Sequence, residues 1–198
     1  MSIARLVVEQ VGPAATIQDA GRPGQMRFGV PASGPVDRIA FAAVNAALGN
    51  ASGTAMVETG PGPLVLHCIE GELACAIGGP GFGVKVDDAV SQPWSVVVLQ
   101  PGMRLSVRDD GSGHWGYLGF AGLLSSNTWL GSAATHRLAK LGGGALQQGQ
   151  ELEIVDARVR EAGPLASPDI YDDGPVRVVL GPQERYFGRD AIAALQSR

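Results

Sequence analysis

Residues 54–86, TAMVETGPGPLVLHCIEGELACAIGGPGFGVKV, contain the pattern that decides the fold. Short apolar segments are separated here by glycine and proline, which are the strongest breakers of regular structure. Segments of this length, rich in valine, isoleucine and leucine and bounded by turn residues, are typical of β-strands. The stretch predicts four consecutive strands, at Thr54–Thr59, Pro63–Ile69, Glu72–Ile77 and Phe82–Val86.

The same pattern continues on both sides of this stretch. Ile3–Val11 is predicted to be an opening strand, apolar on much of both faces. Further strands are predicted at Ser95–Leu99, Met103–Arg108, Trp115–Ala121 and Gln150–Val155. Many short strands with turn signals between them and few helices predict a mainly β protein, built as a sandwich or a closed barrel. Closure into a barrel would also remove free strand edges, which otherwise promote aggregation.

One segment before the C-terminal region has helical periodicity, Asp37–Leu48. Its apolar residues recur three and four positions apart, at Ala40, Phe41, Val44, Ala47 and Leu48. Ser33 or Asp37 can cap its start, and Gly49-Asn50 can end it in the left-handed conformation. Since its only charged residues lie in the first turn, we expect this helix to pack against a sheet or inside the mouth of a barrel.

The sequence divides into a long β-rich part and a short C-terminal part. We assign residues 1–165 to an N-terminal domain and residues 166–175, which are rich in proline, glycine and aspartate, to a linker. Residues 176–198 are predicted to contain a strand at Val176–Leu180 and a helix near Arg189–Gln196. One strand and one helix cannot bury a core. These residues either dock on the first domain or begin a second, truncated domain, and we expect the latter.

Composition and charge exclude several classes of function. The chain of 198 residues has a formal net charge of −4 and no cluster of Lys and Arg, so nucleic acid is not an expected partner. The N-terminal residues lack the apolar core of a signal peptide, and no stretch is long and apolar enough for a membrane span. Cys68 and Cys75 are expected to be free, buried thiols in a reducing compartment. We therefore expect a cytoplasmic protein without membrane association.

Local motifs assign neither a catalytic residue nor a metal or cofactor site. The glycine-rich stretch Gly79–Gly83 lacks the lysine and serine of a P-loop and the register of a dinucleotide-binding turn. No G-x-S-x-G elbow is present. The three histidines, His67, His114 and His136, are far apart in sequence, and the two cysteines lack C-x-x-C spacing, so no metal site is predicted.

Several motifs taken together are similar to those of one known family. In chain order they are IQDAGRPG at 17–24, GVPASGPVD at 29–37, AVNAALGN at 43–50, ETGPGPL at 58–64, LGS at 130–132, LGG at 141–143, LQQG at 146–149 and VLGPQ at 179–183. Their order and spacing resemble the family of biotin-dependent carboxyltransferases and 5-oxoprolinase C subunits, also called the allophanate hydrolase subunit 2 family. Each piece alone is weak, but the ordered set spans nearly the whole chain.

This resemblance implies a fold, a reaction class and partners. The fold would be a cyclophilin-like β-barrel with one apolar helix, followed by the start of a second barrel, and the partner would be a subunit of related barrel fold. Family members act in the ATP-dependent opening of 5-oxoproline or in carboxyl transfer from carboxybiotin to urea. The implied substrate is therefore a small amide or urea-like molecule. ATP would be used by the assembled complex, and carrier-borne biotin is a possible second cofactor.

The chain departs from the family pattern at three places. Trp115 replaces an arginine of G-x-R-x-Y-L, and residues 131–136 read GSAATH where the family has G-S-R-S-T-Y. The acid of G-A-D is missing at Gly79-Pro80-Gly81. Loss of an arginine removes a bidentate donor for a carboxylate or bicarbonate, which favours a different substrate or weak activity.

Five residues are predicted to bind substrate: Asp19, Arg22, Ser33, Asp37 and Asn45. Asp19 and Arg22 could anchor a small anionic or urea-like molecule, or form a turn in which Asp19 binds backbone amides. Ser33 and Asp37 could present polar groups at the helix start, or only cap the helix. Asn45 lies on the buried helix stripe, where its amide could instead tie the helix to a loop.

Other polar and aromatic groups have mainly structural interpretations. Glu58 is expected to pair with Arg22 or Arg38. Gly131-Ser132 could supply backbone donors to an oxyanion, although a plain turn explains the pair equally well. The three tryptophans, Trp94, Trp115 and Trp129, could line a pocket, but packing in the core or at an interface is the default for such large rings.

Three functional hypotheses follow. The first is a subunit of a hydrolase or carboxyltransferase acting on a small amide-like substrate, with 5-oxoproline preferred and a carboxyltransferase domain of a urea carboxylase system as the alternative. The second is a non-catalytic module that antagonises a kinase inhibitor, and the third is a degenerate structural subunit. The complete motif set over Ile17–Asp37 favours the first, and the lost arginines favour the other two.

Overall fold

The computed structural model describes residues 2–168 and 174–196. By internal contacts the chain divides into two units, Met1–Pro168 and Asp169–Arg198. Within the described residues, no helix is long and apolar enough to cross a membrane.

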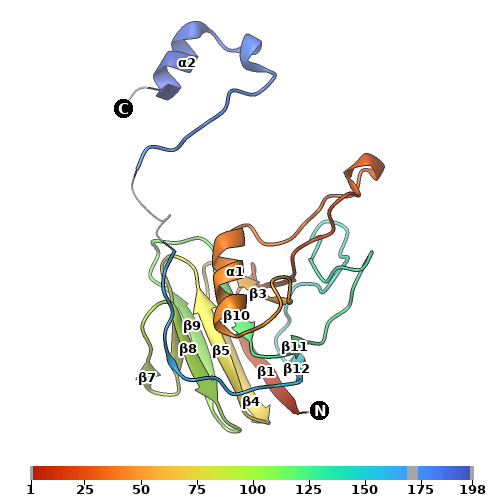
Figure 1. Ribbon diagram of the computed structural model, residues 1–198, viewed down its shortest axis with the longest axis vertical. Coiled ribbons are helices and arrows are strands. Elements are labelled where there is room, and N and C mark those ends of the chain that lie inside the picture. The colour runs from red at the N-terminus through yellow and green to blue at the C-terminus, as the bar shows by residue number, and fades with distance from the viewer. Residues whose placement is uncertain (1, 169–173, 197–198) are drawn as a thin grey trace. The chain divides into compact units, whose positions relative to one another are not determined.

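The larger unit consists of two antiparallel sheets (Figure 1). In spatial order the first contains β11 (Leu123–Leu124), β12 (Glu151–Val155), β1 (Ile3–Val11), β4 (Leu64–Glu70), β9 (Arg104–Asp109), β6 (Phe82–Val86) and β7 (Ala89–Val90). The second contains β13 (Gly163–Pro164), β8 (Ser95–Leu99), β5 (Leu73–Gly78), β10 (Gly116–Phe120), β3 (Met56–Thr59) and β2 (Thr16–Gln18). Neighbouring strands in both sheets pair antiparallel, as expected when short turns connect most strands.

The main core lies between the two sheets. Side chains alternate along each strand, so every second residue of a strand points inward. The first sheet contributes fully buried leucines at 6, 66 and 105, and the second contributes Ile77, Leu99 and Leu118. The predicted inward face of Met103, Leu105 and Val107 agrees with this arrangement, since Leu105 and Val107 are buried and Met103 packs against the same cluster. Burial of this apolar surface is the main force that holds the two sheets together.

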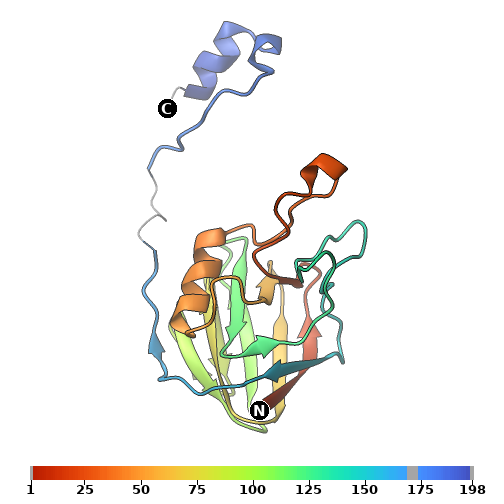
Figure 2. The ribbon, with the colours of Figure 1, turned by 45° about the vertical axis from the view of Figure 1, so that its right-hand side comes forward.

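The helix α1 (Arg38–Ala47) covers the outer face of the second sheet (Figure 2). Its buried face packs on the strands β5 and β10, which present small residues outward: Ala74, Ala76, Gly78, Gly119 and Ala121. A Cβ added at Gly119 would lie 2.6 Å from Val44 Cγ1 and 2.9 Å from Leu48 Cδ1, so the helix can approach this closely only because the position is glycine. This packing forms a second, smaller apolar core.

The sequence predicts most of this unit correctly. The mainly β fold, the helix and the eight longer strands are confirmed within a few residues at their ends. The sheets are open, however, and in the part of the chain that the structure describes no ladder closes them into a barrel. The two-residue strands β7, β11 and β13 form three of the four sheet edges, and such short edges offer little backbone for unwanted pairing. The strand β2 lies among turn-forming residues and gives no strand signal in the sequence.

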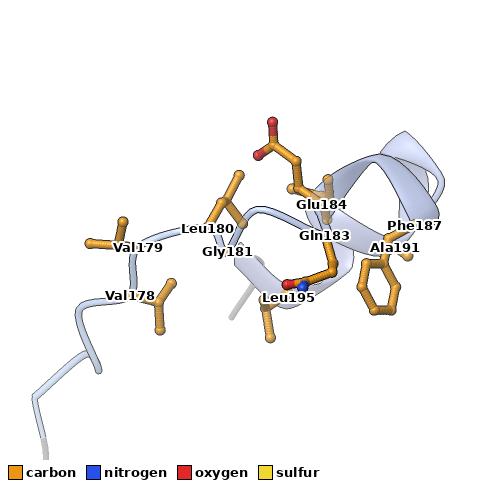
Figure 3. Close-up of a pocket in the computed structure, with 10 residues that line it drawn as sticks. Val178, Val179, Leu180, Gly181, Gln183, Glu184, Phe187, Ala191 and Leu195 are labelled. Atoms are coloured by element: carbon orange, nitrogen blue, oxygen red, sulfur yellow. The ribbon is translucent and has the colours of Figure 1, made fainter. Parts of the chain in front are cut away.

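The smaller unit contains a short 3₁₀ turn, Glu184–Tyr186, and the helix α2 (Arg189–Gln196), which confirms the predicted C-terminal helix. The predicted strand Val176–Leu180 is not formed, because an extended segment becomes a strand only by pairing with a neighbour, and the described residues provide no such pairing. The segment instead borders an apolar groove of about 510 Å³, together with side chains from the 3₁₀ turn and α2 (Figure 3). Of the predicted linker, 166–175, residues 169–173 lie outside the described residues.

Candidate functional site

Two long loops extend from one end of the larger unit and lie side by side (Figures 1 and 2). The first loop, residues 19–37, connects β2 to α1, and the second loop, residues 125–149, connects β11 to β12. Four of the five predicted substrate-binding residues belong to the first loop. The two loops are joined by hydrogen bonds between residues that are more than a hundred positions apart in sequence.

Asp19 supplies the central acceptor between the loops. Its Oδ1 accepts hydrogen bonds from the Gly21 N–H (2.8 Å), the Ser132 hydroxyl (2.6 Å) and the Ala134 N–H (3.1 Å). Its Oδ2 accepts from the Ala133 N–H at 2.6 Å. Consecutive backbone N–H groups in a turn form a concave anion-binding site. Residues 132–134 form such a site, and the carboxylate of Asp19 fills it.

Arg22 makes the second connection, and its side chain is almost completely buried. Its Nη1 donates to Ser33 Oγ at 2.9 Å, its Nε to the Trp129 carbonyl at 3.3 Å, and its Nη2 to the Ala134 carbonyl. The guanidinium carbon also lies 5.1 Å from the centre of the Trp129 ring, within the range of a cation–π contact. Each nitrogen of this guanidinium therefore has a partner within the protein.

The local backbone explains why the first loop folds back on itself. Gly21 has φ +85°, and a Cβ there would lie 2.7 Å from the Ala32 carbonyl oxygen, so only glycine fits. The next residue, Arg22, donates its N–H to the same carbonyl at 2.7 Å. Ser33 also adopts a left-handed conformation, with φ +54°. These contacts hold Ser33 beside Arg22, although eleven residues separate them.

A second polar group lies where the first loop enters α1. The side chain of Glu58, on β3, and that of Tyr117, its cross-strand partner on β10, are both buried. The Tyr117 hydroxyl donates to Glu58 Oε2 at 2.8 Å and accepts from the Asp37 N–H at 2.6 Å. Glu58 Oε2 also accepts from the Val36 N–H at 2.8 Å. The start of the helix is thereby attached to two strands of the second sheet.

Burial governs the protonation of both side chains in this group. Removal from water raises the pKa of Glu58, and the hydrogen bonds from Val36 and Tyr117 oppose this effect only in part. The pKa of Tyr117 is raised as well, first by burial and then by the neighbouring Glu58 carboxylate. The tyrosine therefore remains a neutral hydrogen-bond donor at any physiological pH.

The other two predicted residues belong to the helix α1 and its start. Asp37 caps α1, with its Oδ1 accepting from the Ile39 and Ala40 N–H groups at 2.9 Å each. Asn45 lies within the helix, where its Nδ2 donates to the Thr54 carbonyl at 3.1 Å. The structure thus brings Asp19, Arg22 and Ser33 together, places Asp37 with Glu58 and Tyr117, and leaves Asn45 apart from both groups.

The structure also bears on the expectations for Glu58, for Gly131-Ser132 and for the tryptophans. The predicted pairing of Glu58 with Arg22 or Arg38 is wrong, because Glu58 binds Val36 and Tyr117, while the buried Arg22 turns toward the second loop. The Ala133 and Ala134 amides that follow Gly131-Ser132 bind Asp19. Of the tryptophans, Trp94 and Trp115 pack in or against the smaller core, and Trp129 lies beneath Arg22.

A shallow depression of about 340 Å³ borders Asp19. It is lined by apolar groups and by hydroxyl-bearing side chains of the second loop: Ala55, Leu123, Leu124, Ser125, Ser126, Thr128 and Ala133. Small-molecule sites combine an apolar lining with a few polar groups in this way, and the volume lies at the lower end of their usual range. The depression can accommodate a small polar molecule, with the hydroxyls available to donate to a carbonyl oxygen.

Sequence reasoning did not single out Tyr117, Trp129 and Ser132 as partners of the predicted residues. Tyr117 meets Glu58 only through the register of β3 against β10, which no local pattern reveals. Ser132 and Trp129 lie more than a hundred residues from Asp19 and Arg22. One usable signal was the position of LGS at 130–132 within the same ordered motif set as IQDAGRPG at 17–24.

Comparisons with known proteins agree with the motifs. The family model described as "Carboxyltransferase domain, subdomain A and B" matches residues 28–198. The urea amidolyase of Saccharomyces cerevisiae is 36% identical over 136 residues, which cover 67% of this chain and 7% of that protein. The C subunit of 5-oxoprolinase from Haemophilus influenzae is 29% identical over 148 residues, covering 73% of this chain and 48% of that protein. This chain therefore aligns with about half of the 5-oxoprolinase protein and a small part of the amidolyase.

A solved structure extends the similarity to almost the whole chain. The crystal structure of the protein TTHA0988 superposes on 97% of this chain and 38% of its own, with a TM-score of 0.84 and 28% sequence identity. The match supports the mainly β architecture described above.

Proposed function

The chain belongs to the family of carboxyltransferase domains, subdomains A and B, and on this premise we propose that it serves an ATP-dependent amide-ring hydrolase in the role of a 5-oxoprolinase C subunit. The observation that carries this proposal is the alignment with a free-standing C subunit of 5-oxoprolinase over about half of that protein's length. A protein named as one subunit implies further subunits, so the proposal includes a partner subunit, of related barrel fold.

The proposed substrate is a small cyclic amide such as 5-oxoproline. The depression beside Asp19 has a suitable volume, and its serine and threonine hydroxyls are suitable donors for an amide carbonyl. In this proposal Asp19, Arg22 and Ser33 shape the substrate-binding loops, since their polar atoms bind within the protein. Asp37 and Asn45 hold the helix that supports the first loop. No catalytic residue is assigned.

The residues of the two loops do not fit the triphosphate of ATP. A triphosphate needs unpaired donors, whereas the Ala133 and Ala134 amides bind Asp19 and the Arg22 guanidinium binds Ser33, Trp129 and Ala134. We therefore place ATP elsewhere in the proposed assembly and derive no step through it. Carrier-borne biotin belongs only to the second candidate function below.

The test is an activity assay of the full-length gene product together with the other 5-oxoprolinase subunits of its organism. Release of ADP that depends on 5-oxoproline, and that is lost when this chain is omitted, is the expected result. No release of ADP from a stable complex would contradict the proposal. Such a complex without turnover would instead favour the non-catalytic binding module.

A carboxyltransferase domain of a urea carboxylase is the second candidate. The specific observation in its favour is the 36% identity with the Saccharomyces cerevisiae urea amidolyase, which exceeds the 29% identity with the 5-oxoprolinase protein. The same assay decides between the two candidates when urea and a biotinylated carrier replace 5-oxoproline. ADP release that requires both of these would favour carboxyl transfer.

A further inference from the structure

The tips of the two loops expose large apolar side chains. Met26 and Phe28 in the first loop are 75% and 66% exposed, and Leu130 and Leu138 in the second are 52% and 95% exposed. Single exposed apolar residues are common on any protein, but several on adjacent loops mark a surface that is covered in the functional state. We call these four residues, with the cations described next, the loop-tip surface.

The charge of the loop-tip surface is opposite to that of the protein as a whole. The chain has a net charge of −4, yet residues 20–36 and residues 111–150 contain no aspartate or glutamate. Three exposed cations occur there, Arg27, Arg137 and Lys140. None of them forms an ion pair within residues 2–168 and 174–196. Arg27 lies over the ring of Phe28, 4.7 Å from its centre, which keeps charge and apolar surface together.

The loops that present this surface are fixed before any partner binds. Asp19 and Arg22 join them through hydrogen bonds to Ser132, Ala133 and Ala134. Rigid loops lose little conformational freedom on binding, so more of the contact energy contributes to affinity. A surface of this composition, with Met, Phe and Arg exposed on a supported scaffold, resembles the centre of protein interfaces, where these residue types are enriched.

We propose that the loop-tip surface docks onto an acidic protein surface with an apolar recess, supplied by the partner subunit. The inference rests on the proposed function for the existence of that subunit, but the surface itself follows from the exposed side chains and their charge. Three dispersed cations among apolar side chains are too few for a nucleic-acid backbone. Phe28 and Met26 fill the recess, while the cations pair with carboxylates around it and accelerate association.

The test measures binding of the full-length gene product to the immobilised 5-oxoprolinase partner subunits by surface plasmon resonance. The variants Arg27→Glu and Lys140→Glu are expected to weaken binding about tenfold or more, mainly through slower association and with a weaker salt dependence. Phe28→Ser is expected to weaken it by a similar factor through faster dissociation. All three side chains are exposed, so unchanged melting temperatures verify that the variants fold.

Two matched variants serve as controls: Arg108→Glu, at an exposed cation on β9, and Val90→Ser, at an apolar residue of β7 that is 81% exposed. Both should bind like the wild type. Normal binding by the loop-tip variants, equal losses in the controls, or no binding by the wild type would overturn the inference. Normal binding with a raised KM would mean that the loops admit substrate instead of a partner. A complex that forms through this surface but releases no ADP would sink the proposed function and leave the docking inference intact.

Discussion

At the scale of single residues, the carboxylate of Asp19 has the largest structural task. It receives four hydrogen bonds, three of them from residues 132–134, which lie 113 to 115 positions away in sequence. Hydrogen bonds to an ionised acceptor are stronger than neutral ones, and donors left unsatisfied in a buried place are costly. The position of the second loop therefore depends on one side chain of the first.

Replacement of Asp19 by alanine is expected to lower the free energy of unfolding by about 2–4 kcal/mol, because the Ala133 and Ala134 amides lose their acceptor. Chemical denaturation measures this loss, and limited proteolysis should show earlier cleavage in the second loop. The control is Asp88→Ala, at a fully exposed carboxylate that pairs with Lys85, where little or no change in stability is expected. Equal effects of the two substitutions would contradict the assigned role.

The buried carboxylate of Glu58 predicts a specific dependence of stability on pH. Its folded pKa is raised above the ordinary value of 4.5, so the folded state favours the protonated form. The stabilisation this provides is present below about pH 4.5 and is lost as pH rises through the folded pKa. The variant Glu58→Gln keeps an acceptor for Val36 and Tyr117 but has no charge to bury.

Thermal unfolding of both proteins between pH 4.5 and 8 tests this prediction. The melting temperature of Glu58→Gln should rise relative to that of the wild type as pH increases, and the difference should level off above the folded pKa of Glu58. A difference that is independent of pH would show that the charge of Glu58 is not the cause.

At the scale of elements, the helix α1 depends on the small residues of the sheet beneath it. Ala74 and Ala76 on β5 and Gly119 on β10 alternate with large inward residues, so the same strands present a small outer face and a bulky inner face. The helix approaches this outer face closely, and its start is attached there through Asp37, Glu58 and Tyr117. The helix in turn fixes the direction in which the first loop leaves the sandwich.

The variant Gly119→Ala tests the close approach of α1. The added Cβ would meet Val44 at 2.6 Å, so the helix must shift, at an expected cost of about 1–3 kcal/mol in the free energy of unfolding. The control is Gly83→Ala on β6, where nothing lies within 4 Å of the added Cβ. Urea denaturation of both variants measures the difference, and a neutral Gly119→Ala would contradict the tight packing of helix and sheet.

At the scale of the whole molecule, both apolar cores belong to one unit. Every residue in either cluster, including Leu165, which packs against the smaller one, lies within Met1–Pro168. The second unit has its own apolar groove, formed by α2 and residues 178–187. Residues 2–168 thus contain the packed interior that the described chain possesses, and the loops of the candidate site extend from it.

A chain of residues 1–168 is accordingly expected to unfold cooperatively, with a melting temperature within about 2–4 °C of that of the full 198 residues, because a change of this size corresponds to less than about 1 kcal/mol. Differential scanning calorimetry of the two chains makes the comparison. A broad transition, or loss of the transition in the shorter chain, would show that its cores do not suffice.

The sequence alone determined the elements of this protein and its family. Alternation of apolar residues, turn-forming glycine and proline, and helical periodicity at Asp37–Leu48 are local signals, because they reflect which face of each element is buried. The ordered motifs led to the carboxyltransferase family for the same reason, since they can be read in order along the chain. The predicted residues Asp19, Arg22 and Ser33 also proved to lie together.

Only the tertiary structure decided how these elements meet. It divided the strands between two open sheets, set β10 against β3 so that Tyr117 faces Glu58, and brought Ser132 to Asp19 across 113 residues. Strand order, register and the meeting of distant loops depend on how all apolar faces are buried at once, which no local window of sequence contains. For the same reason, Asp19 and Arg22 could be named as polar loop residues, but their occupation by partners within the protein could not be foreseen.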